Sequence, residues 1–359
     1  MGIVRVLLFF LAAAFLVGCA TPLGPGAIRS SHRPYNDSVL KTLNEQLLLN
    51  LVRLKYRDNP YFIEVSSITS QQTVGGRVGA TGGFPGLSNR LQDIGLSAGG
   101  TYEDSPTITF QPLQGEEFIQ KLLAPIPIEG MLKMTQSGWS IDRVMRLAVE
   151  QANQLYNAPT ASGPTPERPP EYQRFHEMTD LLRDIQSRNG LDVSIEGEEV
   201  AMVFEQGRVS REEGLEIRRV LEVESYGEKV ILTNRPERNR GPDDLYLQTR
   251  SVIGILFFLS HATEVPPSDI EKGLVTVTKY EDGQIFDWRW VTGDLLQVHY
   301  SETPPVDSFV KTRYRGKWFY IADDDLESKS TFMLLNQLFN LLAGDIKKAA
   351  PVLTIPVGG

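Results

Sequence analysis

Cys19 is the only cysteine in this 359-residue chain, and it comes shortly after an apolar run at residues 6–16. The residues after it can therefore form no disulfide with one another and no cluster of thiolates around a metal ion. An ordinary hydrophobic core must hold the fold together. With 41% hydrophobic and 23% charged residues, the chain is long enough for one large domain or two ordinary ones. The same composition excludes a disordered polar chain and a multi-pass membrane protein.

The N-terminus has the parts of a secretory signal. Arg5 supplies a positive charge, residues 6–16 are apolar, and the sequence Leu16-Val17-Gly18-Cys19 follows. This apolar run is too short for a membrane-spanning helix, which needs about 20 residues, but it suits a signal peptide. The four residues that end at Cys19 resemble the lipobox of bacterial lipoproteins. The alternative is an ordinary signal peptide or N-terminal anchor that happens to contain a cysteine.

The resemblance to bacterial lipoproteins implies that residues 1–18 are a signal peptide and that Cys19 is the lipidation site. In that family the thiol receives a diacylglycerol, cleavage leaves the cysteine as the new N-terminus, and its amine is often acylated as well. Several acyl chains, at about 0.8 kcal/mol per buried CH₂, hold a protein firmly on a bilayer. Ala20 stands where an aspartate tends to retain enterobacterial lipoproteins in the inner membrane. We therefore expect an outer-membrane protein whose body faces the periplasm.

The charge of the chain limits the classes of partner. The formal net charge is −9, and no long block of Lys and Arg offsets it, so nucleic acid is not an expected partner. The expected partners are the membrane, through the N-terminal lipid, and envelope proteins of unknown identity or further copies of this chain.

The order of patterns along the chain predicts an α+β fold, with an N-terminal helical part that carries a Gly-rich β-hairpin and a C-terminal antiparallel sheet packed by helices. Residues 19–35 are rich in Pro and Gly and predict a flexible, extended tether. Residues 36–157 then form a helical subdomain with the hairpin, 158–170 a Pro-rich linker, and 171–359 an α+β domain. The alternative for 158–170 is a surface loop within one domain.

Apolar periodicity predicts the individual elements. Helices are expected at 37–57, 116–123, 141–155, 172–189, 243–261 and 326–343, with 210–223 either helix or strand. Strands are expected at 191–195, 200–204, 229–233, 274–280, 284–291, 295–300, 309–314 and 317–321, with a possible edge strand at 352–355. Gly316 is expected at the tip of the last hairpin, and the acidic run 323–325 at the N-terminus of the helix that begins at 326.

Residues 63–110 combine strand-like patterns with a cluster of glycines and predict one long hairpin, or two. Such a hairpin is either a surface excursion from a small sheet or a segment that joins the hairpins of sister subunits to form a pore. Transmembrane strands need about 9–11 residues with apolar residues at every second position. Here the alternation is patchy, and five charged residues argue against the pore: Arg77, Arg90, Asp93, Glu103 and Asp104.

The sequence Gly95-Leu96-Ser97-Ala98-Gly99 matches the nucleophile elbow of serine hydrolases, with Asp294 and His299 available as partners. That elbow requires a strand before the serine and a helix after it. Residues 100–106 do not favour a helix, so this motif is better explained as a glycine-softened strand.

Other chemistry is sparse. The histidines at 32, 176, 261 and 299 have no short spacing, so neither a metal site nor a cofactor is predicted. His261, at the end of an apolar helix, is expected to be a cation that interacts with the helix dipole. Arg235, Arg238 and Arg240 are expected in a solvated loop. The pairs Trp288/Trp290 and Trp318/Tyr320 are expected on the packed side of strands, with a glycan- or peptide-binding platform as the alternative.

The resulting hypothesis is a lipid-anchored cell-envelope protein that acts as a structural or protein-interaction module and is not catalytic. The first alternative is a subunit of an oligomeric outer-membrane channel or export complex that contributes the 63–110 hairpin. The second is a periplasmic serine hydrolase that uses Ser97. The stretches 44–50 and 56–62 are similar to uncharacterised envelope proteins of Gram-negative bacteria, a similarity that implies no activity.

Overall fold

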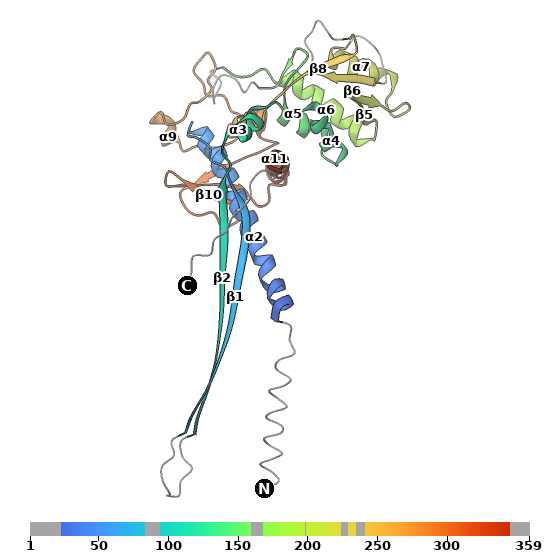
Figure 1. Cartoon of the computed structure of the whole chain (residues 1–359). Coiled ribbons are helices and arrows are strands. Elements are labelled where there is room, and N and C mark those ends of the chain that lie inside the picture. Colours follow the sequence, from blue (N-terminus) through green and yellow to red (C-terminus); the bar gives the residue numbers. More distant parts are fainter. Residues whose placement is uncertain are drawn as a thin grey trace, which may run out of the picture. The chain divides into compact units, whose positions relative to one another are not determined.

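The computed structural model of the chain describes residues 23–82, 94–158, 168–197, 199–223, 229–234 and 241–344 (Figure 1). It is an α+β fold, as the sequence predicts. The chain divides into two compact units. The first contains the residues up to Leu43 together with Ile63–Pro112, and the second contains Asn44–Phe62 and the residues from Leu113 onward.

The first unit contains one long β-hairpin. Strand β1 (Ile63–Gly82) pairs antiparallel with β2 (Ile94–Pro112), and the two strands run side by side over their whole length (Figure 1). At about 3.4 Å per residue, each strand is about 65 Å long. The prediction of a hairpin is confirmed, and of the two alternatives, one hairpin or two, the structure shows one. Its crossing, residues 83–93, lies outside the described residues.

Helix α2 (Leu23–Lys55) covers the helix predicted at 37–57 except for its last two residues, and it begins much earlier. The prediction of an extended tether is therefore wrong for residues 23–35, whereas 19–22 lie outside the described residues. Pro25 lies in the first turn, where a backbone N–H has no helical acceptor and its absence costs little. Pro34 has no N–H and so removes one hydrogen bond inside the helix. Separately, the Ser38 hydroxyl donates to the Pro34 carbonyl (2.8 Å).

The second unit contains a mixed six-stranded sheet with the strand order β4-β3-β8-β7-β6-β5. The strands are β3 (Val149–Ala152), β4 (Leu155–Tyr156), β5 (Leu191–Glu196), β6 (Glu199–Phe204), β7 (Lys229–Thr233) and β8 (Asp244–Thr249). Strands β7 and β8 are parallel, so this sheet is not the purely antiparallel one that the sequence predicts.

The same sheet bears on the predicted linker at 158–170. Strands β3 and β4 precede this segment and β5 to β8 follow it, yet β3 pairs directly with β8. A domain boundary at this position would divide one hydrogen-bonded sheet, so the structure favours the alternative of a loop within one domain. Residues 159–167 themselves lie outside the described residues.

A second sheet of three antiparallel strands has the order β10-β11-β9. It consists of β9 (His299–Ser301), β10 (Ser308–Tyr314) and β11 (Lys317–Ala322). Arg315 and Gly316 connect β10 to β11, and both have positive φ angles of 47° and 83°. This is the geometry of a two-residue hairpin turn, so the prediction for Gly316 is confirmed.

The helices of the second unit are α3 (Glu116–Leu123), α4 (Ile128–Gln136), α5 (Ile141–Ala148), α6 (Gln173–Ser187), α7 (Arg211–Leu221), α8 (Val252–Ser260), α9 (Pro267–Glu271), α10 (Arg289–Thr292) and α11 (Leu326–Gly344). The predicted helices at 116–123, 172–189 and 326–343 are confirmed, and 210–223 is helical. The acidic run caps α11 as predicted, because the Asp325 carboxylate accepts a hydrogen bond from the Ser328 backbone N–H (3.0 Å).

Several predicted elements are wrong in extent or type. The helices predicted at 141–155 and 243–261 end or begin at strands, because residues 149–156 and 244–249 pair in the six-stranded sheet. Of the strands predicted at 274–280 and 284–291, only an isolated bridge between Lys279 and Ile285 exists, and α10 occupies the end of the second. The strand predicted at 295–300 is confined to β9.

Helix α8 lies in the hydrophobic core of the second unit. Ile255, Leu256 and Leu259 are fully buried there. Among the described residues, no helix is both long enough and apolar enough to cross a bilayer.

Candidate functional site

The register of the β1–β2 hairpin sorts its residues into two alternating sets, because successive residues of a strand lie on opposite faces of a sheet. Cross-strand pairs such as Ile68 with Ile108 and Val74 with Tyr102 belong to one face, which we call the apolar set. In β1 the apolar set consists of Ile63, Val65, Ile68, Ser70, Gln72, Val74, Gly76, Val78, Ala80 and Gly82. In β2 it consists of Ile94, Leu96, Ala98, Gly100, Tyr102, Asp104, Pro106, Ile108, Phe110 and Pro112.

The opposite face, which we call the polar set, contains only Ser, Thr, Gln, Gly, Glu and Arg. In β1 it consists of Glu64, Ser67, Thr69, Gln71, Thr73, Gly75, Arg77, Gly79 and Thr81. In β2 it consists of Gly95, Ser97, Gly99, Thr101, Glu103, Ser105, Thr107, Thr109 and Gln111. This composition is typical of a hairpin that exposes one face to water and the other to an apolar environment.

A β-bulge maintains the separation at the base of the hairpin. Val65 pairs with Phe110 and Ser67 pairs with Thr109, so Ser66 is an extra residue on β1. Without it, Ile63 and Val65 would fall on the polar face.

Polar residues interrupt the apolar set at two successive levels of the hairpin. Gln72 pairs with Asp104 at one level, and Ser70 pairs with Pro106 at the next level toward the base. From the Gln72–Asp104 level to the far end, every member of the apolar set is apolar or glycine, over residues 73–82 and 94–103. These two segments of about ten residues each match the length of transmembrane strands. Tyr102 lies at their border, where aromatic girdles occur in such strands.

The register also places the charged residues that, from the sequence alone, argue against a pore. Arg77 and Glu103 both belong to the polar set, and Asp104 lies at the level where the apolar set is interrupted. Arg90 and Asp93 lie outside the described residues. Between the Asp104 level and the far end of the hairpin, the described apolar set therefore contains no charged residue.

The sheet contains only β1 and β2, and no further strand within the described residues pairs with the outer edge of either. Long unpaired edges are templates for pairing with another chain, and an isolated two-stranded hairpin is marginally stable in water.

Ser97 lies within β2 and pairs with Gly79, and the strand continues through Pro112. The helix that a nucleophile elbow requires after the serine is absent at this position. Of the proposed partners, Asp294 binds Arg146 and His299 contacts Glu264, both within the second unit. The local geometry thus gives the hydrolase hypothesis no support.

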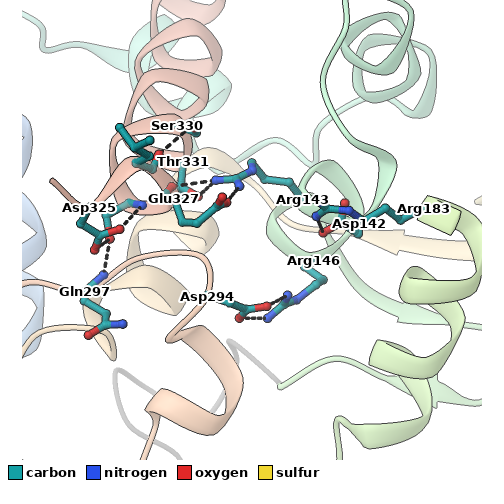
Figure 2. Close-up of polar contacts among 12 residues, drawn as sticks. Asp142, Arg143, Arg146, Arg183, Asp294, Gln297, Asp325, Glu327, Ser330 and Thr331 are labelled. Atoms are coloured by element: carbon teal, nitrogen blue, oxygen red, sulfur yellow. Dashed lines mark hydrogen bonds and ion pairs between the residues drawn. The ribbon is translucent and has the colours of Figure 1, made fainter. Parts of the chain in front are cut away.

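The polar cluster of the second unit surrounds α5, as Figure 2 shows. The buried Arg146 donates to both carboxylate oxygens of Asp294 (2.5 and 2.7 Å). The buried Arg143 donates to the Thr331 hydroxyl (2.7 Å) and forms an ion pair with Glu327, both on α11. These contacts connect α5 to α11 and to the segment before β9, so the cluster ties the fold together. The sequence gives no signal for it beyond two arginines one turn apart.

A pair of charges on α5 and α6 extends this cluster. The carboxylate of the buried Asp142 accepts a hydrogen bond from Arg183 (3.0 Å; Figure 2). The arginines of the cluster are therefore occupied by carboxylates of the same chain, which leaves little charge for an external anion.

Arg250 is the largest fully buried polar side chain of the second unit, and sequence analysis missed it. Its guanidinium donates to the carbonyls of Arg146, Leu147 and Val149 at 2.9–3.1 Å. It also donates to the carbonyls of Asn157 and Ala158 (2.5 and 2.8 Å). The Asn157 side-chain amide also donates to the carbonyls of Arg146 and Val149 (2.8 and 2.7 Å). Arg250 and Asn157 together therefore satisfy the carbonyls where α5 turns into β3, and Arg250 satisfies those where β4 ends.

The described histidines occupy three different environments. Burial, followed by the charge of Arg146, lowers the pKa of His176 to about 4. His261 stacks on Trp288 with ring centroids 3.9 Å apart, and burial holds its pKa well below the usual value. The prediction of a cationic His261 is therefore wrong, because desolvation outweighs the helix dipole. A hydrogen bond to Glu264 raises the pKa of His299.

No group of three or more His, Cys, Asp or Glu residues in the described part of the chain is arranged to hold a metal ion. Several residues named in the sequence analysis lie outside what the structure describes. They are the side chain of His32, Cys19, the arginines at 235, 238 and 240, and the segment 352–355.

The aromatic pairs do not form the strand faces that the sequence predicts. Trp288 and Trp290 flank the start of helix α10, where Trp288 is buried and Trp290 is 69% exposed. On β11 the packed face carries Phe319 and Ile321, whereas Trp318 and Tyr320 lie on the other face. The assignment to the packed side is wrong because the alternation of β11 has the opposite phase.

No protein-family model, curated protein or solved structure matches this chain.

Proposed function

We propose that this chain is a lipid-anchored outer-membrane protein whose β1–β2 hairpin pairs with the hairpins of further copies to form a transmembrane channel. The observation that carries the proposal is the register of the hairpin. It assigns all strongly apolar residues of both strands to one face and only polar residues and glycine to the other. This is the alternation of strands that face lipid on one side and a water-filled lumen on the other.

The open edges of the hairpin support assembly from several copies. Inside a bilayer every backbone N–H and C=O must be paired, so a transmembrane sheet has to close on itself. The smallest such sheets have about eight strands, which corresponds to about four hairpins. A wide aqueous lumen has about 16 strands, which corresponds to about eight copies.

The N-terminus supports the proposed location. The lipobox-like motif at Cys19 implies an acyl anchor, and Ala20 favours the outer membrane. A lipid anchor keeps each copy at the membrane surface before assembly, which raises the local concentration of hairpins. The body of the protein would then face the periplasm.

A structural or protein-interaction module remains the second candidate, in which the hairpin pairs with a different envelope protein. The observation that favours it is the exposure of large apolar side chains in the second unit, where Leu123 is 60%, Trp290 69% and Val306 89% exposed. In this case the purified chain alone forms no channel.

Channel formation is tested with full-length protein, purified from membranes and added to planar lipid bilayers. We expect stepwise conductance from the wild-type chain. Val78→Arg should abolish it, because an arginine that faces lipid costs about 2–4 kcal/mol per copy. Mass spectrometry of the same material should show residues 1–18 removed and acyl chains on Cys19.

Thr81→Arg is the matched control, because Thr81 is close to Val78 on the same strand but belongs to the polar set. It should leave conducting channels. The proposal is contradicted if the wild-type protein forms no channels, or if the Val78 and Thr81 variants behave alike.

A further inference from the structure

We infer that Arg77 forms a ring of positive charge in the lumen of the proposed channel and makes it selective for anionic solutes. This inference rests on the proposed function and adds a substrate class to it. Arg77 belongs to the polar set and pairs with Gly99 on β2.

Arg77 is the only charged residue of the polar set between the Glu103 level and the far end of the described strands. The other members there are Gly75, Gly79, Thr81, Gly95, Ser97, Gly99 and Thr101. Hydroxyls and glycine backbone are neutral, so the arginine alone determines the sign of the potential in this part of the lumen.

The position opposite Arg77 leaves open space. Gly99 is exposed, and a Cβ atom added to it would have no heavy atom within 4 Å. A glycine at this position keeps the lumen free beside the arginine, so a hydrated anion has room at the same level.

The spacing of copies decides whether the arginines act together. Adjacent strands lie about 4.8 Å apart, so equivalent residues of neighbouring two-stranded hairpins are separated by about 10 Å. This is comparable to the Debye length of about 8–10 Å at moderate ionic strength. The fields of neighbouring arginines therefore overlap and form a continuous positive ring.

Glu103 does not cancel this ring. It pairs with Thr73, four residues from Arg77 along β1, which corresponds to about 13 Å. The distance exceeds the Debye length, so the glutamates form a separate ring near one end of the membrane-crossing segment. Rings of basic residues favour anions in pores of this kind.

The test is the reversal potential of reconstituted channels in a KCl gradient. Wild-type channels should pass Cl⁻ in preference to K⁺, Arg77→Gln should shift the permeability ratio severalfold toward K⁺, and Arg77→Lys should keep the anion preference. Glu103→Gln should leave that preference intact or increase it.

Two failures can be told apart. Absence of any conductance from the wild-type protein contradicts the channel itself. Conducting channels that prefer cations, or whose permeability ratio is the same in the wild type and Arg77→Gln, contradict only the role of Arg77.

Discussion

Buried titratable side chains in the second unit couple its stability to pH. The imidazole of His176 lies beside the Arg146–Asp294 pair, and its buried Nε2 atom has no hydrogen-bond partner among the described residues. A proton on this ring would meet both desolvation and the charge of Arg146, so the folded protein holds His176 neutral.

The lowered pKa of His176 predicts a loss of stability in acid. Below pH 6.5 the unfolded chain binds a proton at this residue that the folded protein binds only near pH 4. The stabilisation by His176 relative to His176→Asn should therefore decrease by roughly 3 kcal/mol as the pH falls from 7 to 4. Urea denaturation of both proteins across this range measures it.

His299→Asn provides a control with the opposite sign. Because its hydrogen bond to Glu264 raises the pKa of His299, the stabilisation by this histidine is present below pH 6.5 and is lost as the pH rises through the folded-state pKa. If both variants showed the same pH dependence, the assignment of the two environments would be wrong.

Arg250 connects several secondary-structure elements, because its five hydrogen bonds join the end of α5, the start of β3 and the residues after β4. Arg250→Met has a similar volume but cannot donate, so it leaves several buried carbonyls unsatisfied. We expect it to lower the free energy of unfolding by about 3–5 kcal/mol, measured by chemical denaturation.

Arg219→Met is the matched control, since Arg219 is an exposed arginine that pairs with Glu216 in its own helix. Its free energy of unfolding should be indistinguishable from wild type. Equal effects of the two substitutions would show that the carbonyl contacts of Arg250 contribute little.

The elements that sequence reasoning predicts well are those whose periodicity has one interpretation. The helices predicted at 116–123 and 326–343, both confirmed, are examples. Leu245 and Leu247, both fully buried on β8, fit the apolar pattern of the following helix equally well. Pairing with β3 and β7, which is not visible in the local sequence, makes this segment a strand.

The hairpin shows why a candidate site can be hidden in a sequence. Apolar and polar residues do not alternate regularly along the sequence of β1, because the bulge at Ser66 shifts the phase. The charged residues of β1 and β2 also cannot be assigned to a face before the register is known. Once Thr73 is paired with Glu103, Arg77 and Glu103 fall on one face and the apolar residues on the other. The register, a non-local property, therefore carries the functional information.

In the proposed assembly of several copies, one face of the hairpin contacts lipid and the other contacts water. The chain offers a direct probe, because Cys19 is its only cysteine and acylation at its sulfur would make it unreactive. A cysteine introduced into β2 is then the only free thiol of each copy.

The most direct measurement is the reactivity of single cysteines at positions 97, 98, 99 and 100 toward a membrane-impermeant maleimide, in protein reconstituted into liposomes. We expect strict alternation: Ser97→Cys and Gly99→Cys react, whereas Ala98→Cys and Gly100→Cys are protected and become reactive only after the bilayer is dissolved. Uniform reactivity at all four positions, or protection of the odd-numbered ones, would contradict it.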